Sequence, residues 1–464
     1  MVRTEPLSPE LRRLNLEIEA IAREAGLDFF PVIFELLDAR DVNALAAYTG
    51  FPVRYPSWRF GMEFERLDKG YSWGLSKIYE LVINNDPTYA YLVRSNTLME
   101  QKLVMAHVYG HADFFKHNVW FGPTDRQMVD SMADHGVRIR RYMDRHGQEA
   151  VERFLDTALA LDNLIDPYLP LREQRASASP GPRPLSRREH ARRSLSAVTG
   201  TPVEEAPQEP GFRPTLDILG FLAEHCELPD WQRDVLAIVR SEAYYFVPQR
   251  MTKIMNEGWA SFWHSRIMTR SVLGAGEIVD FADCHSGATA TRPGQLNPYK
   301  LGIDLFRHAE EQGQDLFKLR ALHNDVSFID TLVDEDFARR SNLFLYERNA
   351  RTGRMEVANR DWRAIKEQLL ASMAGGGAPQ IELVEADLEG RGELLLAHRF
   401  DGRELQLDQA GQTLRVLAGL WGRPCHLTTT ADGQSLRIWT DGGEVRRVET
   451  AEGAPEQDSE RAAG

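Results

Sequence analysis

Apolar residues recur at helical spacing over most of the first 370 residues. Residues 9–26 follow Ser8-Pro9, a typical helix start, and place apolar side chains three or four positions apart: Leu11, Leu14, Ile18 and Ile21. Residues 97–116 contain no proline and one glycine, so they predict a single uninterrupted helix. Residues 27–92 are rich in aromatic residues and broken by prolines.

The pattern changes twice along the second half of the chain. Helical spacing resumes near Thr215 and continues past residue 340, with an interruption or kink expected at Pro248. From residue 379, apolar and polar positions alternate and Asp-Gly pairs mark turns, which predicts strands. We therefore expect a mainly α fold with a small C-terminal β-rich domain over residues 379–449.

Two segments carry too few large apolar residues to form a core. Residues 172–212 are rich in Arg, Ser, Pro and Ala, and residues 450–464 are polar and small. Both are expected to be disordered, the first as a linker and the second as a tail. The linker separates an N-terminal helical region, residues 1–171, from a second helical half, residues 213–370, and the tail follows the β-rich domain.

The composition limits which classes of partner and which cellular compartment we expect. The formal net charge of −14 disfavours nucleic acid and anionic membrane surfaces as partners. The three cysteines are widely spaced and form no CxxC pair, so neither a disulfide scaffold nor a thiolate zinc site is indicated. The N-terminus has no apolar signal core and no run of about 18 apolar residues occurs, so we expect a cytoplasmic protein.

The strongest candidate for chemistry is the segment of residues 99–118. His107 and His111 are four positions apart on a predicted helix, which stacks both imidazoles on one face as a metal ion requires. Glu100, seven positions before His107, lies on a similar face. A structural histidine pair is the alternative.

A second candidate lies in residues 253–268, where Glu257 and His264 are seven positions apart and share a helical face. Glu257 is surrounded by apolar and aromatic neighbours, where an unpaired carboxylate is costly, so it needs a cation, a hydrogen-bond network or a metal. Pairing with Arg250 or Arg59 is the structural alternative. Two helices that each offer Glu and His together favour a metal site.

A third segment, residues 283–306, gives weaker signals. Cys284 and His285 are adjacent, whereas a catalytic Cys/His dyad normally joins residues distant in sequence. Tyr299 follows an irregular stretch at the expected start of a helix and could point into a cleft.

The amino-acid sequence of these segments resembles the SpoVR (stage V sporulation protein R) family. The similarity rests on YPSWRFGMEFERLDKGYSWGLSKIYELVINNDPTYAYL, LVMAHVYGHADFFKHN, MNEGWASFWHSRIM and NPYKLG, in that order. It covers roughly residues 10–170 and 215–450. The resemblance implies a link to sporulation, spore cortex formation or stress response. It also implies partnership with a PrkA-type serine kinase and a von Willebrand A-like protein.

A more distant resemblance concerns helical metallopeptidases. HVYGH is similar to the zincin motif HExxH, and NEGWASF is similar to the segment that supplies their third zinc ligand. This resemblance implies a zincin-like main domain with His107, His111 and Glu257 as metal ligands and Tyr299 as an oxyanion stabiliser. Val108 stands where the motif has its catalytic glutamate, which leaves Glu100 and His264 as candidate bases.

Three functions follow as hypotheses. The first is a metal-dependent hydrolase holding a divalent ion, zinc before iron or manganese, without the usual HExxH glutamate. The second is a non-catalytic regulatory or binding protein that works with the kinase. The third is a dinuclear redox protein, ranked last because the Glu-x-x-His spacing of such sites is absent. The sequence does not identify the substrate.

Overall fold

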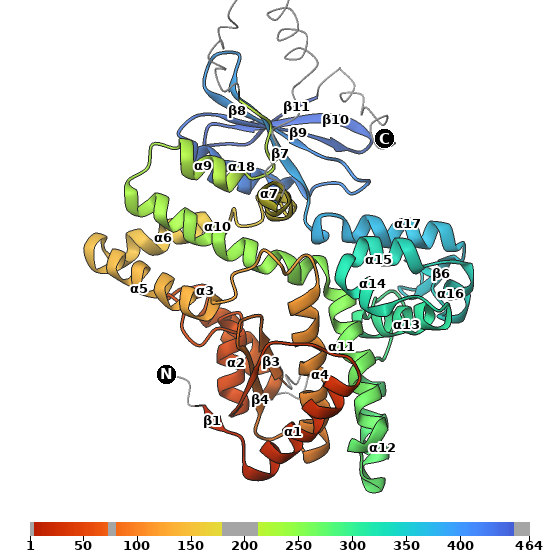
Figure 1. The fold of residues 1–464 in the computed structure, drawn as a ribbon. Helices are drawn as coiled ribbons and strands as arrows, with labels where there is room; N and C mark the ends of the chain where they lie inside the picture. Colours follow the sequence, from red (N-terminus) through yellow and green to blue (C-terminus); the bar gives the residue numbers. More distant parts are fainter. Residues whose placement is uncertain (1–3, 73–79, 179–211, 450–464) are drawn as a thin grey trace, which may run out of the picture. The chain divides into compact units, whose positions relative to one another are not determined.

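The computed structural model describes residues 4–72, 80–178 and 212–449 (Figure 1). The chain forms two compact units, one of residues 1–159 and 228–378 and one of residues 160–227 and 379–464. The second unit therefore includes residues 160–171 and 213–227, which the sequence analysis assigned to the helical regions. Of the two segments expected to be disordered, residues 172–178 belong to helix α7, while 179–211 and 450–464 lie outside the described residues.

A four-stranded mixed sheet forms part of the first unit, and the sequence analysis did not predict it. Its strand order is β1-β2-β4-β3, with β2 and β4 parallel and the outer pairs antiparallel. The strands are β1 (Glu5–Pro6), β2 (Val32–Leu37), β3 (Glu80–Ile83) and β4 (Thr88–Val93). The first part is mainly helical, as expected, but the segments Val32–Leu37, Glu80–Ile83 and Thr88–Val93 are strands that the helical expectation did not include.

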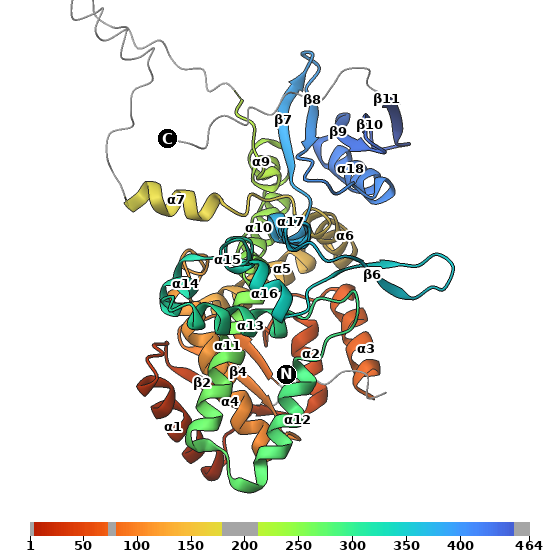
Figure 2. The same cartoon turned by 90° about the vertical axis from the view of Figure 1, so that its right-hand side faces the viewer.

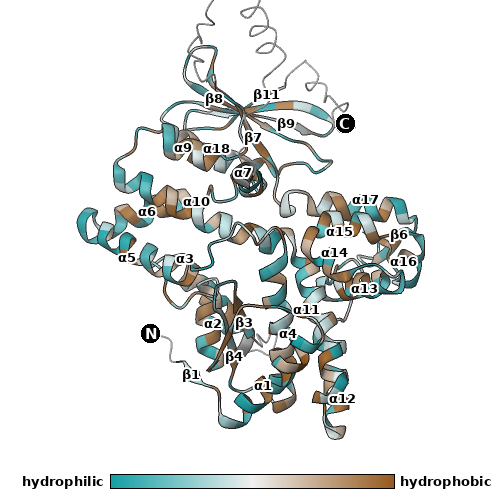
Figure 3. Cartoon of the chain, viewed as in Figure 1, coloured by the Kyte–Doolittle hydropathy of each residue, from teal (hydrophilic) through white to brown (hydrophobic). Residues whose placement is uncertain are grey.

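Both faces of this sheet are buried by helices. Phe34 and Leu92 point into a core shared with α4, while Tyr91 and Val93 point into a second core shared with α2, α5 and α10. Strands buried on both faces read as continuous apolar runs and lose the alternation that identifies a half-exposed strand. Helix α2 and strands β3 and β4 are accordingly coloured as mainly hydrophobic in Figure 3.

The helical prediction is confirmed for most of the first unit. Of the predicted helix over residues 9–26, Pro9–Glu24 form α1, capped by the Ser8 side chain with proline in the first turn. Of the predicted helix over residues 97–116, all but the N-cap Thr97 belongs to α4. The helices before residue 160 are α1 (Pro9–Glu24), α2 (Ala39–Ala47), α3 (Trp58–Ser72), α4 (Leu98–His117), α5 (Met128–His146) and α6 (Gln148–Leu159).

The second half of this unit is a run of helices and one hairpin. Pro248 lies inside α10, which ends three residues later, and α11 follows directly. The helices are α10 (Asp230–Met251), α11 (Lys253–Ile267), the π-helix η1 (Met268–Val272), the short η2 (Ala275–Glu277), α12 (Ile278–Ala288), α13 (Pro298–Glu311), α14 (Leu316–Leu322), α15 (Asp325–Leu332), α16 (Glu335–Arg340), α17 (Trp362–Met373) and η3 (Ala374–Gly377). The hairpin consists of β5 (Leu345–Arg348) and β6 (Met355–Asn359).

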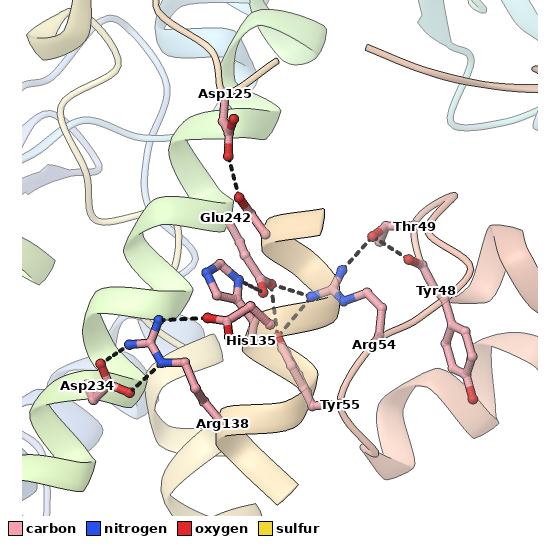
Figure 4. A network of polar contacts seen from close by, with 11 residues as sticks. Tyr48, Thr49, Arg54, Tyr55, Asp125, His135, Arg138, Asp234 and Glu242 are labelled. Carbon is pink, nitrogen blue, oxygen red and sulfur yellow. Dashed lines mark hydrogen bonds and ion pairs between the residues drawn. The ribbon is translucent and has the colours of Figure 1, made fainter. Parts of the chain in front are cut away.

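A buried ionic network ties the segment after α2 to the helical layer (Figure 4). The Arg54 guanidinium donates to the Glu242 carboxylate on α10, and both side chains are buried. His135 on α5 lies 2.9 Å from the same carboxylate, and the Tyr55 hydroxyl donates to it at 3.0 Å. A buried carboxylate with this many partners is compensated, so the network has a structural role.

The second unit contains the predicted β-rich domain. Its five-stranded sheet has the order β11-β10-β9-β8-β7, and α18 connects the parallel pair β8 and β9. Its elements are α7 (Leu169–Ala178), α9 (Ile218–His225), β7 (Ile381–Leu388), β8 (Glu393–His398), α18 (Leu407–Trp421), β9 (Cys425–Ala431), β10 (Gln434–Thr440) and β11 (Arg446–Glu449). Thr215 pairs with Leu383 and brings the chain before α9 onto β7.

Across the described residues, no helix combines the length and apolar character needed to cross a membrane.

Candidate metal centre

Helix α4 carries the two histidines of the HVYGH segment in the middle of the first unit. Thr97 and Glu100 form a capping box that fixes the start of the helix, and the Glu100 carboxylate accepts the Thr97 N–H at 2.7 Å. Most of the helix is buried on all sides, including His107 and His111. Its wide burial explains why it shows little amphipathic periodicity.

Three helices approach one another closely at this point because glycines face their neighbours. A Cβ added to Gly110 on α4 would lie 2.6 Å from the Cα of Ala260 on α11. A Cβ added to Gly258 on α11 would lie 2.4 Å from the carbonyl carbon of Gly302 on α13. The glycines of HVYGH, NEGWA and YKLG therefore act as contact points that bring α4, α11 and α13 together.

The start of α11 is fixed by a buried carboxylate on α15. Asp325 accepts the backbone N–H groups of Ile254 and Met255, each at 2.9 Å. These donors belong to the first turn of α11 and have no partner within the helix. The contact sets the position of Glu257, one turn further along.

His107, His111 and Glu257 meet in one cluster, as the sequence analysis expected. The Glu257 Oε2 lies 3.5 Å from the His107 Nε2 and 3.6 Å from the His111 Nε2, and all three ligand atoms lie within 4.8 Å of one another. The histidines are buried and the Glu257 side chain is 20% exposed. In the described part of the chain, neither His107 Nε2 nor Glu257 Oε2 has a hydrogen-bond partner.

Asn256 orients the His111 ring. The His111 Nδ1 lies 2.9 Å from the Asn256 Oδ1, an atom that only accepts, so His111 carries its proton on Nδ1. Its Nε2 then presents a lone pair to the Glu257 carboxylate. Burial and the neighbouring His107 lower the pKa of His111 to about 4, which keeps the ring neutral.

The charges of the cluster support one another. Burial alone would lower the pKa of His107, but Glu257 and Glu80 outweigh this effect and raise it. Burial alone would raise the pKa of Glu257, but the two histidines and a hydrogen bond from Tyr299 lower it. His107 and Glu257 thus each favour the charged form of the other.

Tyr299 and Glu80 lie beside the cluster. Tyr299, at the start of α13, donates to Glu257, and its ring stacks near His107 with centroids 6.2 Å apart. Burial strongly raises the pKa of Tyr299, so its hydroxyl stays protonated. Glu80, at the start of β3, acts electrostatically on His107, Glu257 and Tyr299. The sequence analysis missed Glu80 because nothing in its local pattern indicates a site.

His264 lines the same cluster and continues it toward α12. Its Nδ1 lies 2.9 Å from the His107 Nδ1, and its Nε2 lies 3.1 Å from the His285 Nδ1. His285 is half-buried, and Figure 2 shows its helix, α12, next to α4 and α11. The sequence analysis considered His285 only as a weak partner of Cys284.

Other sequence candidates do not join the cluster. Glu100 caps α4 about two turns before His107, roughly 10 Å along the axis, so the structure does not place it as a base for the site. Arg59, considered as a structural partner of Glu257, instead donates to Asp156 at 3.1 Å. Glu257 faces two histidines and a tyrosine.

Comparison with known proteins agrees with the resemblance of these motifs. The family described as "SpoVR like protein" matches residues 6–378, and "SpoVR-like C-terminal domain" matches residues 379–432. The boundary between the two matches coincides with the start of the last segment of the second unit.

A bacterial relative matches over almost the full length. The "Uncharacterized protein YcgB" of Escherichia coli (strain K12) is 30% identical to this chain over an alignment of 484 residues. The alignment covers 91% of this chain and 92% of the relative. No solved structure matches the chain significantly. With both parts of the family pattern present in order, the chain belongs to the SpoVR family.

Proposed function

We propose that His107, His111 and Glu257 bind one divalent metal ion and that this centre is hydrolytic. The observation that carries the proposal is the meeting of the His111 Nε2 lone pair with the Glu257 Oε2 at 3.6 Å, with no proton to place between them. Two buried acceptors face each other favourably only when a cation lies between them.

The spacing of the ligand atoms fits such an ion. Ligands about 2.0–2.1 Å from a tetrahedral zinc ion lie about 3.3 Å from one another. The separations of 3.5 Å and 3.6 Å from the Glu257 Oε2 to the two histidine nitrogens are close to that value, and all three ligand atoms lie within 4.8 Å of one another. Two imidazoles and one carboxylate are a typical donor set of catalytic zinc, and iron and manganese are the next candidates.

The surrounding residues supply the other groups that hydrolysis needs. A metal with three protein ligands keeps a position for water, whose acidity it increases. Val108 cannot accept a proton, so another group has to act as the general base. Glu80 is our candidate, because its carboxylate interacts electrostatically with His107 and Glu257. The Tyr299 hydroxyl, protonated and adjacent to Glu257, would donate to a developing oxyanion. The order of HVYGH, NEGWA and NPY supports a zincin-like arrangement.

Metal analysis tests the proposal. Protein purified without chelators is offered zinc, iron(II) or manganese(II), dialysed and analysed for bound metal. We expect about one ion per chain in the unmodified protein and a loss of at least tenfold in affinity for His111→Ala or Glu257→Gln. His117→Ala is the matched control, because His117 lies on the same helix but contacts Asp28 outside the cluster.

Two results would count against the proposal. Absence of metal in the unmodified protein under all three conditions would remove the site, and equal metal in His111→Ala would relocate it. A bound ion without an open coordination position would instead favour a regulatory protein, for which a PrkA-type kinase is the proposed partner. Two ions per chain would favour the dinuclear alternative.

A further inference from the structure

Three histidine rings form a continuous hydrogen-bonded chain that begins at the proposed metal centre. The chain runs from His107 on α4 through His264 on α11 to His285 on α12, with nitrogen separations of 2.9 Å and 3.1 Å. His264 is 4% exposed, so water does not compete for its two nitrogens. Each contact joins two ring nitrogens, and therefore one nitrogen of each pair must carry the proton.

This condition restricts the chain to two orientations when the rings are neutral. In the outward orientation, His107 Nδ1–H donates to His264 Nδ1, and His264 Nε2–H donates to His285 Nδ1. In the inward orientation, every donor and acceptor is exchanged, and His107 carries its proton on Nε2. Only the outward orientation leaves the His107 Nε2 bare, on the side of Glu257.

We propose that His264 and His285 are positioning residues that hold His107 as the Nδ1–H tautomer and so direct its Nε2 to the metal. The inference rests on the proposed function. In this orientation each ring of the chain carries one proton, and the His107 Nε2 would be free to hold the metal. Partners on the second nitrogen of a metal-bound histidine orient the ring and increase its basicity.

The same geometry excludes the role that the sequence analysis gave to His264. Both of its nitrogens face other imidazoles, so neither is available to a substrate or to the metal without breaking a buried contact. His264 therefore acts through His107. Asn256 has the matching role for His111, which means that each histidine ligand has its own acceptor for Nδ1–H.

Zinc affinity, measured by competition with a chromophoric chelator, tests the chain. We expect His264→Phe, which keeps a ring of similar size but accepts no hydrogen bond, to weaken zinc binding 10- to 100-fold. His264→Gln, whose Oε1 can accept from His107, should stay within about threefold of the unmodified protein. His117→Phe is the control for the loss of an imidazole elsewhere on α4.

Nitrogen-15 spectra of the histidine rings can be recorded on the unmodified protein, so this measurement does not require any variant to fold. In the zinc-loaded unmodified protein, His264 and His285 should both be Nε2–H tautomers, and His107 and His111 should both be Nδ1–H tautomers. Zinc binding by His264→Phe at unchanged affinity, or the opposite tautomers in the unmodified protein, would overturn the inference while leaving the metal site intact. Failure of the unmodified protein to bind any metal would instead remove the proposed function itself.

Discussion

Unsatisfied buried polar atoms are costly, and two of those in the described residues meet at the candidate centre. His107 Nε2 and Glu257 Oε2 lie in a protein interior where most polar side chains have a partner. The surrounding contacts are complete, with Asn256 on His111 and His264 on His107. A site whose outer contacts are satisfied and whose inner atoms are not is arranged for a further ligand.

Substitution of Asn256 tests whether this outer contact matters. In Asn256→Ala, His111 loses the acceptor for its Nδ1–H and can take the other tautomer, so we expect metal affinity to fall 10- to 100-fold. Asn256→Asp keeps the acceptor oxygen and should retain metal binding. Titration with zinc in the presence of a competing chelator measures both. Equal affinities for the alanine and aspartate variants would contradict this role.

The raised pKa of Asp325 predicts that the stability of the protein depends on pH. Burial raises its pKa from 3.8 to about 7 even though backbone N–H groups of α11 lower it. The pKa of Asp325 is higher in the folded protein than in the unfolded chain. Its contribution to the free energy of unfolding is therefore complete below pH 4 and is lost as the pH rises to about 7. The shift of about three pH units corresponds to a loss on the order of 4 kcal/mol.

Urea unfolding at a series of pH values measures this dependence. Asp325→Asn cannot ionise, so the difference in unfolding free energy between the two proteins should change in favour of the variant as pH rises. The variant still offers one acceptor oxygen to the start of α11. A difference that is constant between pH 4 and pH 8 would show that Asp325 does not titrate in this range.

At the scale of the elements, α4, α11 and α13 are held at a distance that only glycine permits. An added methyl at Gly258 would come within 2.4 Å of the backbone of α13, and backbone cannot move aside as a side chain can. The candidate ligands lie on two of these helices and Tyr299 on the third. The separation of the helices therefore sets the separation of the ligands.

Alanine substitutions test this dependence. Gly258→Ala should destabilise the protein by about 1–3 kcal/mol through overpacking and reduce metal content, because it pushes α11 away from α13. Gly61→Ala on α3 is the control, since nothing lies within 4 Å of the added carbon. That variant should gain about 0.5–1 kcal/mol from helix propensity. Chemical denaturation and metal analysis of both variants decide the comparison.

The sequence correctly predicted those features that depend on a pattern within one short segment. The spacing of His107 and His111 and the capping of α1 are local properties, and the structure agrees with both. Strands β2 and β4 were missed because they are short, apolar on both faces and paired across about fifty residues. Glu80 and the role of His285 were missed because they depend on which elements pack together.

At the scale of the whole molecule, each unit has its own buried core. In the second unit, Leu394 and Leu396 of β8 are buried, and so is Leu417 of α18. All three candidate ligands belong to the first unit. Compact units with separate cores can unfold in separate steps, in which case no single unfolding temperature describes the protein.

Scanning calorimetry with and without metal tests this independence. Zinc at 100 times its dissociation constant stabilises the state that binds it by about 2.7 kcal/mol, so it should raise the temperature of one transition, that of the first unit. Leu396→Ala removes buried side-chain volume from the second unit. It should reduce the free energy of unfolding of that unit by about 2–5 kcal/mol and lower the temperature of that unit's transition only. Metal affinity in that variant should equal that of the unmodified protein, because no ligand lies in the unit it weakens. One common transition that both zinc and Leu396→Ala displace would mean that the two units unfold as a single cooperative body.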